Sequence, residues 1–174
     1  MIGMMRLAWW REALERLDQG PAPAEPLLAA LADLALSHGV TGSALASIEH
    51  GWTALVGGEP DEAAIARHGR ERGANLFAAA ATLLGVDDDR PPLAGEVWAL
   101  ADLSFRHSQP QVRDAARARA RLLAQSLPKG RWPVAARALG ALYALARYDV
   151  ERGARRQGSP RRLLRMLAHR LWGR

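Results

Sequence analysis

Residues 1–18 read MIGMMRLAWWREALERLD, and this stretch decides how the rest of the chain is interpreted. Its large apolar residues recur at spacings of 3, 4 and 3, which places them on one face of an α-helix: Leu7, Trp10, Leu14 and Leu17. Its charged residues lie on the opposite face and form two i,i+4 pairs, Arg11 with Glu15 and Glu12 with Arg16. Such a helix must lay its apolar stripe on other helices, so the stretch predicts one member of a helical bundle.

The remaining sequence predicts an all-α fold. Alanine, the best helix former, is abundant, and β-branched residues are scarce. Proline and glycine turns divide the 174 residues into about eight helices, so we expect one bundle domain spanning 1–174. We place these helices at about residues 1–18, 26–37, 43–55, 61–85, 93–107, 110–127, 133–150 and 160–174. Gly69 and Gly73 lie one turn apart, which allows another backbone to approach closely.

Charge divides the chain into two parts. Residues 1–105 hold 7 basic and 15 acidic side chains, whereas residues 106–174 hold 17 basic and 3 acidic ones. A basic C-terminal third favours anionic partners, such as diphosphate groups, anionic lipid or nucleic acid. The alternative is a solvated face with no dedicated ligand, because 23 of the 24 basic residues are arginine, a usage that genome base composition also produces.

No targeting segment is evident. The longest apolar run, NLFAAAATLLGV at 75–86, is too short to cross a bilayer, and residues 1–5 lack a basic region that leads into a separate apolar stretch. The chain has no cysteine, which excludes disulfides and thiolate metal sites. We therefore expect a cytoplasmic protein, or one attached peripherally to the inner face of a membrane.

No catalytic or metal-ligating residue is predicted. Magnesium sites for diphosphates need carboxylates one helical turn apart, but Asp87, Asp88 and Asp89 are consecutive and precede Pro91–Pro92, so they indicate a solvated loop. The five histidines lack the spacing of a zinc site, and the serines lack the glycine context of a nucleophile elbow.

The tail SPRRLLRMLAHRLWGR, residues 159–174, carries a more specific pattern. Its four leucines share one helical side, and basic residues share another. A basic amphipathic helix that ends in tryptophan is suited to an anionic membrane, with contacts from Arg162, Arg165, Arg170 and Trp172. The alternative is the closing helix of the bundle, with its arginines in solvent. A nucleic-acid partner is not expected, because no helix-turn-helix or stacking strand accompanies the basic residues.

The opening stretch also resembles a known family. IGMMRLAWWREAL, residues 2–14, is similar to the hhRLxWWRxxl helix of the squalene/phytoene synthase family. Three further stretches resemble that family more loosely: PAPAEPLLAAL at 21–31, HGRERGANLFAAAATLLG at 68–85 and GEVWALADLSFRH at 95–107. The resemblance implies an all-α prenyl synthase fold, whose enzymes join two prenyl diphosphates head to head with Mg²⁺ held by two DxxxD motifs.

The motifs that would hold Mg²⁺ are missing. The family's first DxxxD motif precedes the RLxWW helix, and no residues precede that helix in this sequence. The second motif is expected near residues 100–112. Asp102 is the only acidic residue in that window, and the residue four positions after it is Arg106. We interpret Asp102 and Arg106 as a local helix pair. The resemblance thus implies a shortened member without the family's N-terminal helices. The IGMMR context is closest to a non-catalytic branch similar to a respiratory complex I assembly factor.

The sequence therefore favours a non-catalytic protein that binds a prenyl chain or lipid, or that assists assembly with a protein partner or a second copy of itself. Two alternatives stay open: a head-to-head prenyltransferase whose true start lies upstream, with Mg²⁺ as its cofactor, and a basic protein that binds membrane surfaces. Under the first interpretation we expect an apolar cleft lined by Trp10, Leu14, Trp52, Phe77, Leu84 and Trp98.

Overall fold

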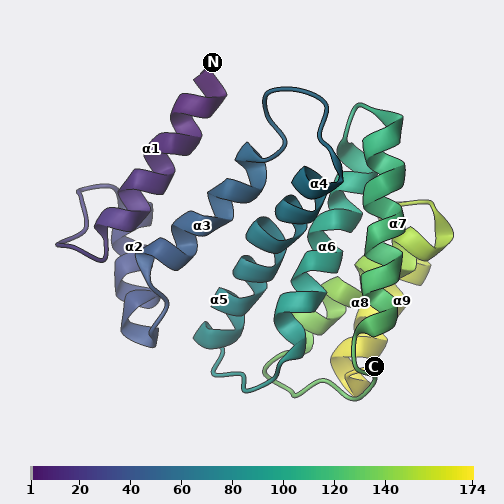
Figure 1. Ribbon diagram of the computed structural model, residues 1–174. Helices are drawn as coiled ribbons and strands as arrows, with labels where there is room; N and C mark the ends of the chain where they lie inside the picture. The colour runs from purple at the N-terminus through teal and green to yellow at the C-terminus, as the bar shows by residue number, and fades with distance from the viewer. Residues whose placement is uncertain (1) are drawn as a thin grey trace.

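The computed structural model describes residues 2–174, and within this range every regular element is helical (Figure 1). The α-helices are α1 (Ile2–Arg16), α2 (Pro26–Leu34), α3 (Gly42–Thr53), α4 (Glu62–His68), α5 (Asn75–Leu83), α6 (Arg90–Arg106), α7 (Pro110–Ser126), α8 (Arg137–Arg152) and α9 (Pro160–Trp172). A short 3-10 helix, η1 (Leu36–His38), follows α2, and a π-helical segment, η2 (Gly69–Ala74), joins α4 to α5. Because α4, η2 and α5 form one continuous rod, the prediction of an all-α bundle of about eight helices is confirmed.

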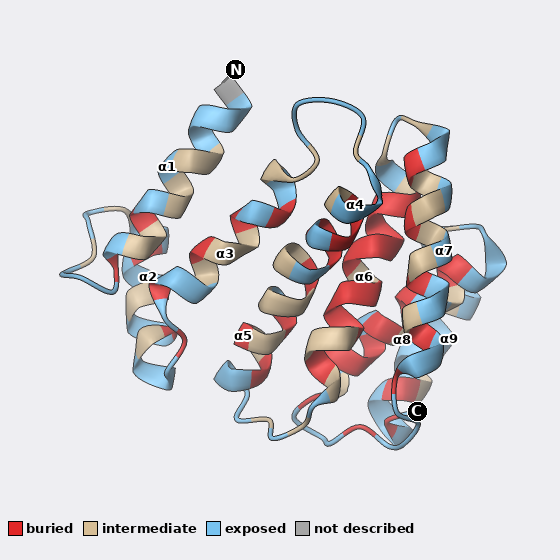
Figure 2. Ribbon diagram, viewed as in Figure 1, coloured by how far each residue is buried: buried red, intermediate tan, exposed pale blue. Residues whose placement is uncertain are grey.

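Helix α6 forms the centre of the bundle. Figure 2 shows it buried along most of its length, with α5, η2, α7 and α8 packed around it. Its alanines and small aliphatic residues let the neighbours approach closely; the fully buried ones are Ala94, Val97, Ala99 and Leu100. The main core runs from α4 to α8 through these residues.

Glycine permits the closest helix crossing in this core. A Cβ atom on Gly73 would lie 2.6 Å from the carbonyl carbon of Gly95, and one on Gly69 would lie 3.0 Å from Leu100. Any larger residue at Gly73 would therefore push η2 away from α6. The close backbone approach predicted from Gly69 and Gly73 is confirmed.

The N-terminal helices form a second, smaller cluster. Ala13 of α1 and Leu17, the residue after this helix, pack on Leu28 of α2, while α1 lies along α3. Asp18 fixes this arrangement, because its carboxylate accepts hydrogen bonds from the backbone N–H groups of Gly42 (2.5 Å) and Ser43 (2.8 Å) at the start of α3. These bonds, chiefly the one from Ser43, hold the pKa of Asp18 below its usual value.

Two helix starts differ from the prediction. Helix α6 begins at Arg90 rather than at Leu93, so Pro91 and Pro92 lie in its first turn. Proline is tolerated there because the backbone N–H groups of a first turn make no hydrogen bond within the helix. Helix α8 begins at Arg137 rather than at Pro133, because residues 134–136 form a turn closed by the bond from Ala136 N to the Pro133 carbonyl.

In residues 2–174, no single helix combines the length and the apolarity that a bilayer span requires. One strongly bent pair, Pro26–His38 with Gly42–Thr53, meets the length and composition criteria only when its two parts are joined across a bend of 116°.

Candidate functional site

Helix α9 packs on the bundle through its polar side. His169 is 2% exposed and faces the ring of Trp132, with 6.1 Å between ring centroids. About two turns earlier, Arg162 donates to the buried carboxylate of Asp149 on α8. The helix therefore turns Arg162 and His169 inward, while its other arginines are exposed.

The apolar side of α9 is left in solvent as a consequence. The leucines predicted to share one face do so, and all of them are exposed by 47% to 64%: Leu163, Leu164, Leu167 and Leu171. We call these four residues the leucine face. Most amphipathic helices bury their apolar side, so α9 is inverted and leaves a contiguous apolar patch exposed.

Several contacts fix α9 in this orientation. The Arg137 guanidinium donates to the carbonyls of Arg170 (2.9 Å) and Leu171 (3.1 Å) at the end of α9. The carbonyl of Gly173 accepts from the backbone N–H of Trp132 at 2.8 Å. Cations and donors at a helix C-terminus satisfy its free carbonyls, so the end of α9 is held firmly against the bundle.

The four residues predicted as membrane contacts divide into two groups. Trp172, at 59% exposed, and Arg170 lie on the open surface. Arg165 is exposed as well and lies over the ring of Tyr148 at 4.7 Å, whereas Arg162 is held inward by Asp149. The sequence pattern found the apolar face but could not show that Arg162 points inward, because its partner lies 13 residues away.

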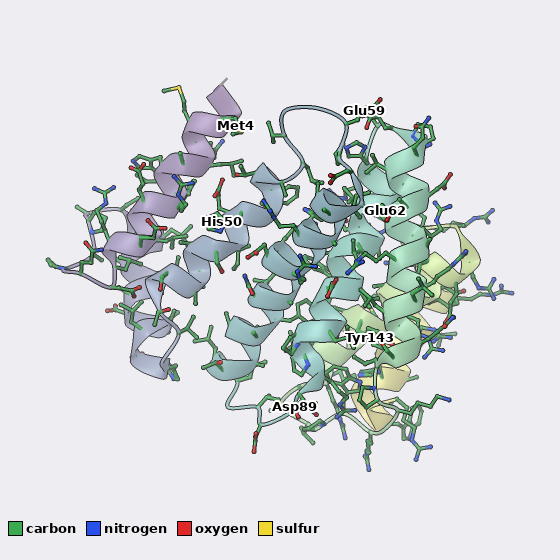
Figure 3. All side chains as sticks on the ribbon, in the orientation of Figure 1. Met4, His50, Glu59, Glu62, Asp89 and Tyr143 are labelled. Atoms are coloured by element: carbon green, nitrogen blue, oxygen red, sulfur yellow. The ribbon has the colours of Figure 1, made fainter. Side chains whose placement is uncertain are left out.

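A separate apolar groove lies between the start of α1 and the end of α3. Its volume is about 660 Å³, and mainly apolar side chains line it: Met4, Leu7, Trp10, Trp52, Leu55 and Val56, with Arg6 and His107 at its edge. Met4 is labelled at the start of α1 in Figure 3. Two of the six residues predicted for an apolar cleft, Trp10 and Trp52, are thus brought together here.

The other four predicted cleft residues lie elsewhere. Phe77 is 1% exposed in the main core, where its ring lies 5.6 Å from that of Trp98. Leu14 packs in the small cluster of α1 and α2. Leu84 caps α5 and is 45% exposed, so its predicted inward position is wrong: the helix has ended before its side chain could reach the core.

Between the groove and α9 lies a buried group of ions centred on Asp102. Its carboxylate contacts Arg72 (3.1 Å), Arg106 (2.9 Å) and Arg155 (2.8 Å). Burial raises the pKa of Asp102, but the hydrogen bond from Arg155 and the charges of Arg72 and Arg106 outweigh it, so the pKa lies below its usual value. The predicted pair of Asp102 with Arg106 is confirmed, and two further arginines complete it.

The π-helical segment positions Arg72 in this group. The guanidinium lies over the rings of Trp52 at 4.3 Å and Trp98 at 4.8 Å, and its N–H faces Asp102. Beside it, His68 is fully buried and its Nδ1 contacts the Gly51 carbonyl at 2.7 Å. π-Helical turns often occur at functional sites, and this one links the tryptophan of the groove to the buried ions.

The acidic side chains do not converge elsewhere. Among residues 2–174, no group of three or more histidine, aspartate or glutamate side chains is arranged to hold a metal ion. In the loop that carries Asp89 (Figure 3), Asp88 instead binds Arg90, with 2.8 Å to its Nε. The surface features of the described chain are a leucine face, an apolar groove and an arginine-rich end.

No family model matches the chain, and neither a curated protein nor a solved structure is significantly similar to it.

Proposed function

We propose that this protein binds anionic membrane surfaces through α9. The observation that carries the proposal is the inverted packing of this helix, which holds its leucine face outward while Arg137 and Trp132 anchor its end. Arg170 and Trp172 flank the leucine face. Nitrogen-tipped side chains gather around this end of the molecule in Figure 3, in agreement with the 17 basic residues in positions 106–174.

The expected affinity follows from two contributions. Each basic residue near an anionic surface is worth roughly 1 kcal/mol and is screened by salt. Burial of a leucine side chain is worth roughly 1.5–3 kcal/mol when complete, and insertion at an interface is only partial. Four leucines and a few arginines therefore give reversible binding that needs both the apolar face and the anionic lipid.

Vesicle co-sedimentation tests this proposal. We expect binding to vesicles with 30% phosphatidylglycerol to exceed binding to pure phosphatidylcholine, about tenfold at low salt, and to weaken at high salt. The variant Leu163→Gln, Leu167→Gln, Leu171→Gln should lose this binding without loss of stability, because all three side chains are exposed.

The matched control is Leu27→Gln with Leu34→Gln, which removes side chains of α2 that are 51% and 63% exposed. It should bind vesicles as the unaltered chain does. Equal binding to neutral and anionic vesicles, or full binding by the triple variant, would refute the membrane role.

A second candidate function rests on the groove between α1 and α3. We infer that it takes an apolar chain, because a groove lined by Trp10, Trp52 and aliphatic side chains suits a prenyl or acyl tail. The likeness of residues 2–14 to squalene/phytoene synthases supports the same ligand class.

Tryptophan fluorescence tests the groove. Titration with a non-hydrolysable farnesyl diphosphate analogue should change the emission of Trp10 and Trp52, and Val56→Arg should abolish the change by placing a charge on the groove wall. Val56 is 53% exposed, so the variant should fold. A flat titration with the unaltered chain would exclude this ligand class.

Catalysis is not part of the proposal. Asp102 is surrounded by three arginines, and an ion-paired carboxylate with Arg106 one turn away is a poor ligand for Mg²⁺. Incubation with Mg²⁺ and labelled prenyl diphosphates should yield no condensed product. Formation of squalene or phytoene would replace the binding function with the prenyltransferase alternative.

A further inference from the structure

A cleft of about 880 Å³ lies between the end of α8 and the start of α9, on the side of α9 away from the leucine face. The loop of residues 153–159 closes it, and Gly153 and Gly158 make the turns with φ of +66° and +72°. The side chains that define its chemistry are Tyr148, Asp149, Arg152, Arg156, Arg161 and Arg162.

Positive charge is in excess in this cleft. Four arginines face one carboxylate, and that carboxylate, Asp149, is bound by Arg162. Within residues 2–174, no carboxylate lies within ion-pair distance of Arg152, Arg156 or Arg161. Three arginines without a carboxylate partner thus line one concave space, and the guanidinium fork matches the oxygens of a phosphate group.

The cleft is also ordered before any ligand arrives. Arg152 lies over the ring of Tyr148 at 4.9 Å, which fixes one guanidinium by a cation–π contact. The first turn of α9, a helix of 13 residues, opens into the same space, and the side chain of its N-cap residue Ser159 makes no capping bond. A free hydroxyl and the positive end of a helix dipole both favour an anion there.

Asp149 holds one of the four arginines and leaves the other three for a ligand. Its side chain is 4% exposed, and its Oδ2 accepts from Arg162 and lies 3.8 Å from Nε of Arg155. A buried carboxylate held by two arginines does not oppose an anion in the open cleft as an unpaired carboxylate would.

We propose that this cleft binds a phosphate monoester, with Arg152, Arg156 and Arg161 on the phosphate oxygens. The same chemistry is found in soluble polyol phosphates and in phosphomonoester headgroups of lipids. The site is separate from the leucine face and does not depend on the membrane function.

Isothermal titration calorimetry with glycerol 3-phosphate tests the soluble source. We expect Arg156→Gln with Arg161→Gln to weaken binding about tenfold or more, since both side chains are exposed and their loss removes charge-assisted contacts without disturbing the core. The charge-matched control is Arg67→Gln with Lys129→Gln, two exposed basic residues outside the cleft, which should leave the affinity unchanged.

Vesicles test the lipid source. Phosphatidic acid carries a phosphomonoester and phosphatidylglycerol does not, so vesicles of the two lipids are compared after adjustment to equal surface charge. A preference for phosphatidic acid that the Arg156/Arg161 variant loses and the control keeps assigns the site to a headgroup, even if glycerol 3-phosphate does not bind.

Two results would overturn the proposal: no response to either probe, or a response that survives Arg156→Gln with Arg161→Gln. The triple leucine variant separates this site from the membrane function, because it should still bind glycerol 3-phosphate.

Discussion

Three arginine side chains converge on the carboxylate of Asp102, and this residue joins elements far apart in the sequence. Arg72 comes from η2, Arg106 from α6 itself, and Arg155 from the loop after α8. Removal of the one negative charge would leave buried positive charges facing each other. Loss of one partner from a buried ion pair is far more costly than loss of a surface pair.

We therefore expect Asp102→Asn to lower the free energy of unfolding by about 3 kcal/mol in urea titrations, within the range for broken buried pairs. The control is Asp114→Asn, which removes a carboxylate that is 73% exposed and pairs with Arg117 on the surface of α7. Its cost should stay below about 0.5 kcal/mol. Equal costs for the two variants would contradict the central role of Asp102.

His68 should make stability depend on pH. Burial lowers its pKa to about 4, the charge of Arg72 acts in the same direction, and its bond to the Gly51 carbonyl opposes them. The unfolded chain, with an ordinary histidine pKa near 6.5, takes up a proton first as pH falls. The stability contributed by neutral His68 is therefore complete above about pH 6.5 and is lost as pH falls towards 4, by about 3 kcal/mol at most.

Thermal unfolding at pH 7.0 and pH 4.5 measures this effect. His68→Asn should lose less stability between the two pH values than the unaltered chain. Some dependence should persist, since burial also lowers the pKa of His169. An unchanged pH dependence in the variant would show that His68 does not titrate as inferred.

At the scale of elements, Gly140 decides how α9 is seated on α8. A Cβ atom at this position would lie 2.6 Å from the Trp132 ring and even closer to Nε2 of His169. Both neighbours are buried and neither can move aside freely. Overpacking of this kind costs about 1–3 kcal/mol.

Gly140→Ala should thus loosen α9 more than it unfolds the bundle. Amide hydrogen exchange in residues 160–172 should become faster, while exchange in α6 changes little. Gly20→Ala is the control, because a Cβ atom there meets nothing within 4 Å. Unchanged exchange in α9 would argue that the helix does not depend on this contact.

The periodicity of apolar residues predicted the helices well, and it predicted that the leucines of α9 share a face. It could not predict that this face is exposed. The exposure arises because Arg162 and His169 of α9 contact Asp149 and Trp132, two residues that lie outside the helix. The same limit applies to Asp102. Its pair with Arg106 is a local i,i+4 contact, whereas Arg72 and Arg155 reach it only through tertiary packing.

The π-helical segment η2 shows a second limit. Apolar spacing predicted one helix over 61–85, and the rod is continuous, but its hydrogen-bond register changes at Gly69–Ala74. This change places Arg72 between Trp52 and Trp98. The two glycines of the segment indicated close packing, yet no simple sequence pattern specifies a π turn, so the tryptophan–arginine contact could not be foreseen.

On the scale of the whole molecule, the basic part of the sequence, residues 106–174, gathers as α7, α8 and α9 on the side away from α1 (Figure 1). Helix α1 begins at one side of the molecule and α9 ends at the other (Figure 1). An anionic surface should therefore attract the α9 end and leave the start of α1 facing away. This orientation keeps the groove of Trp10 and Trp52 clear of the surface.

Single labels can measure the orientation, because the chain has no cysteine of its own. An environment-sensitive fluorophore on Leu164→Cys should shift to the blue when anionic vesicles are added, since this position lies on the leucine face. The same label on Met5→Cys, which is 68% exposed near the start of α1, should not shift. Because the attraction is electrostatic, salt should reverse the shift at position 164. A shift at position 5 as large as that at position 164 would mean that the α1 end also meets the membrane, and the proposed orientation would be wrong.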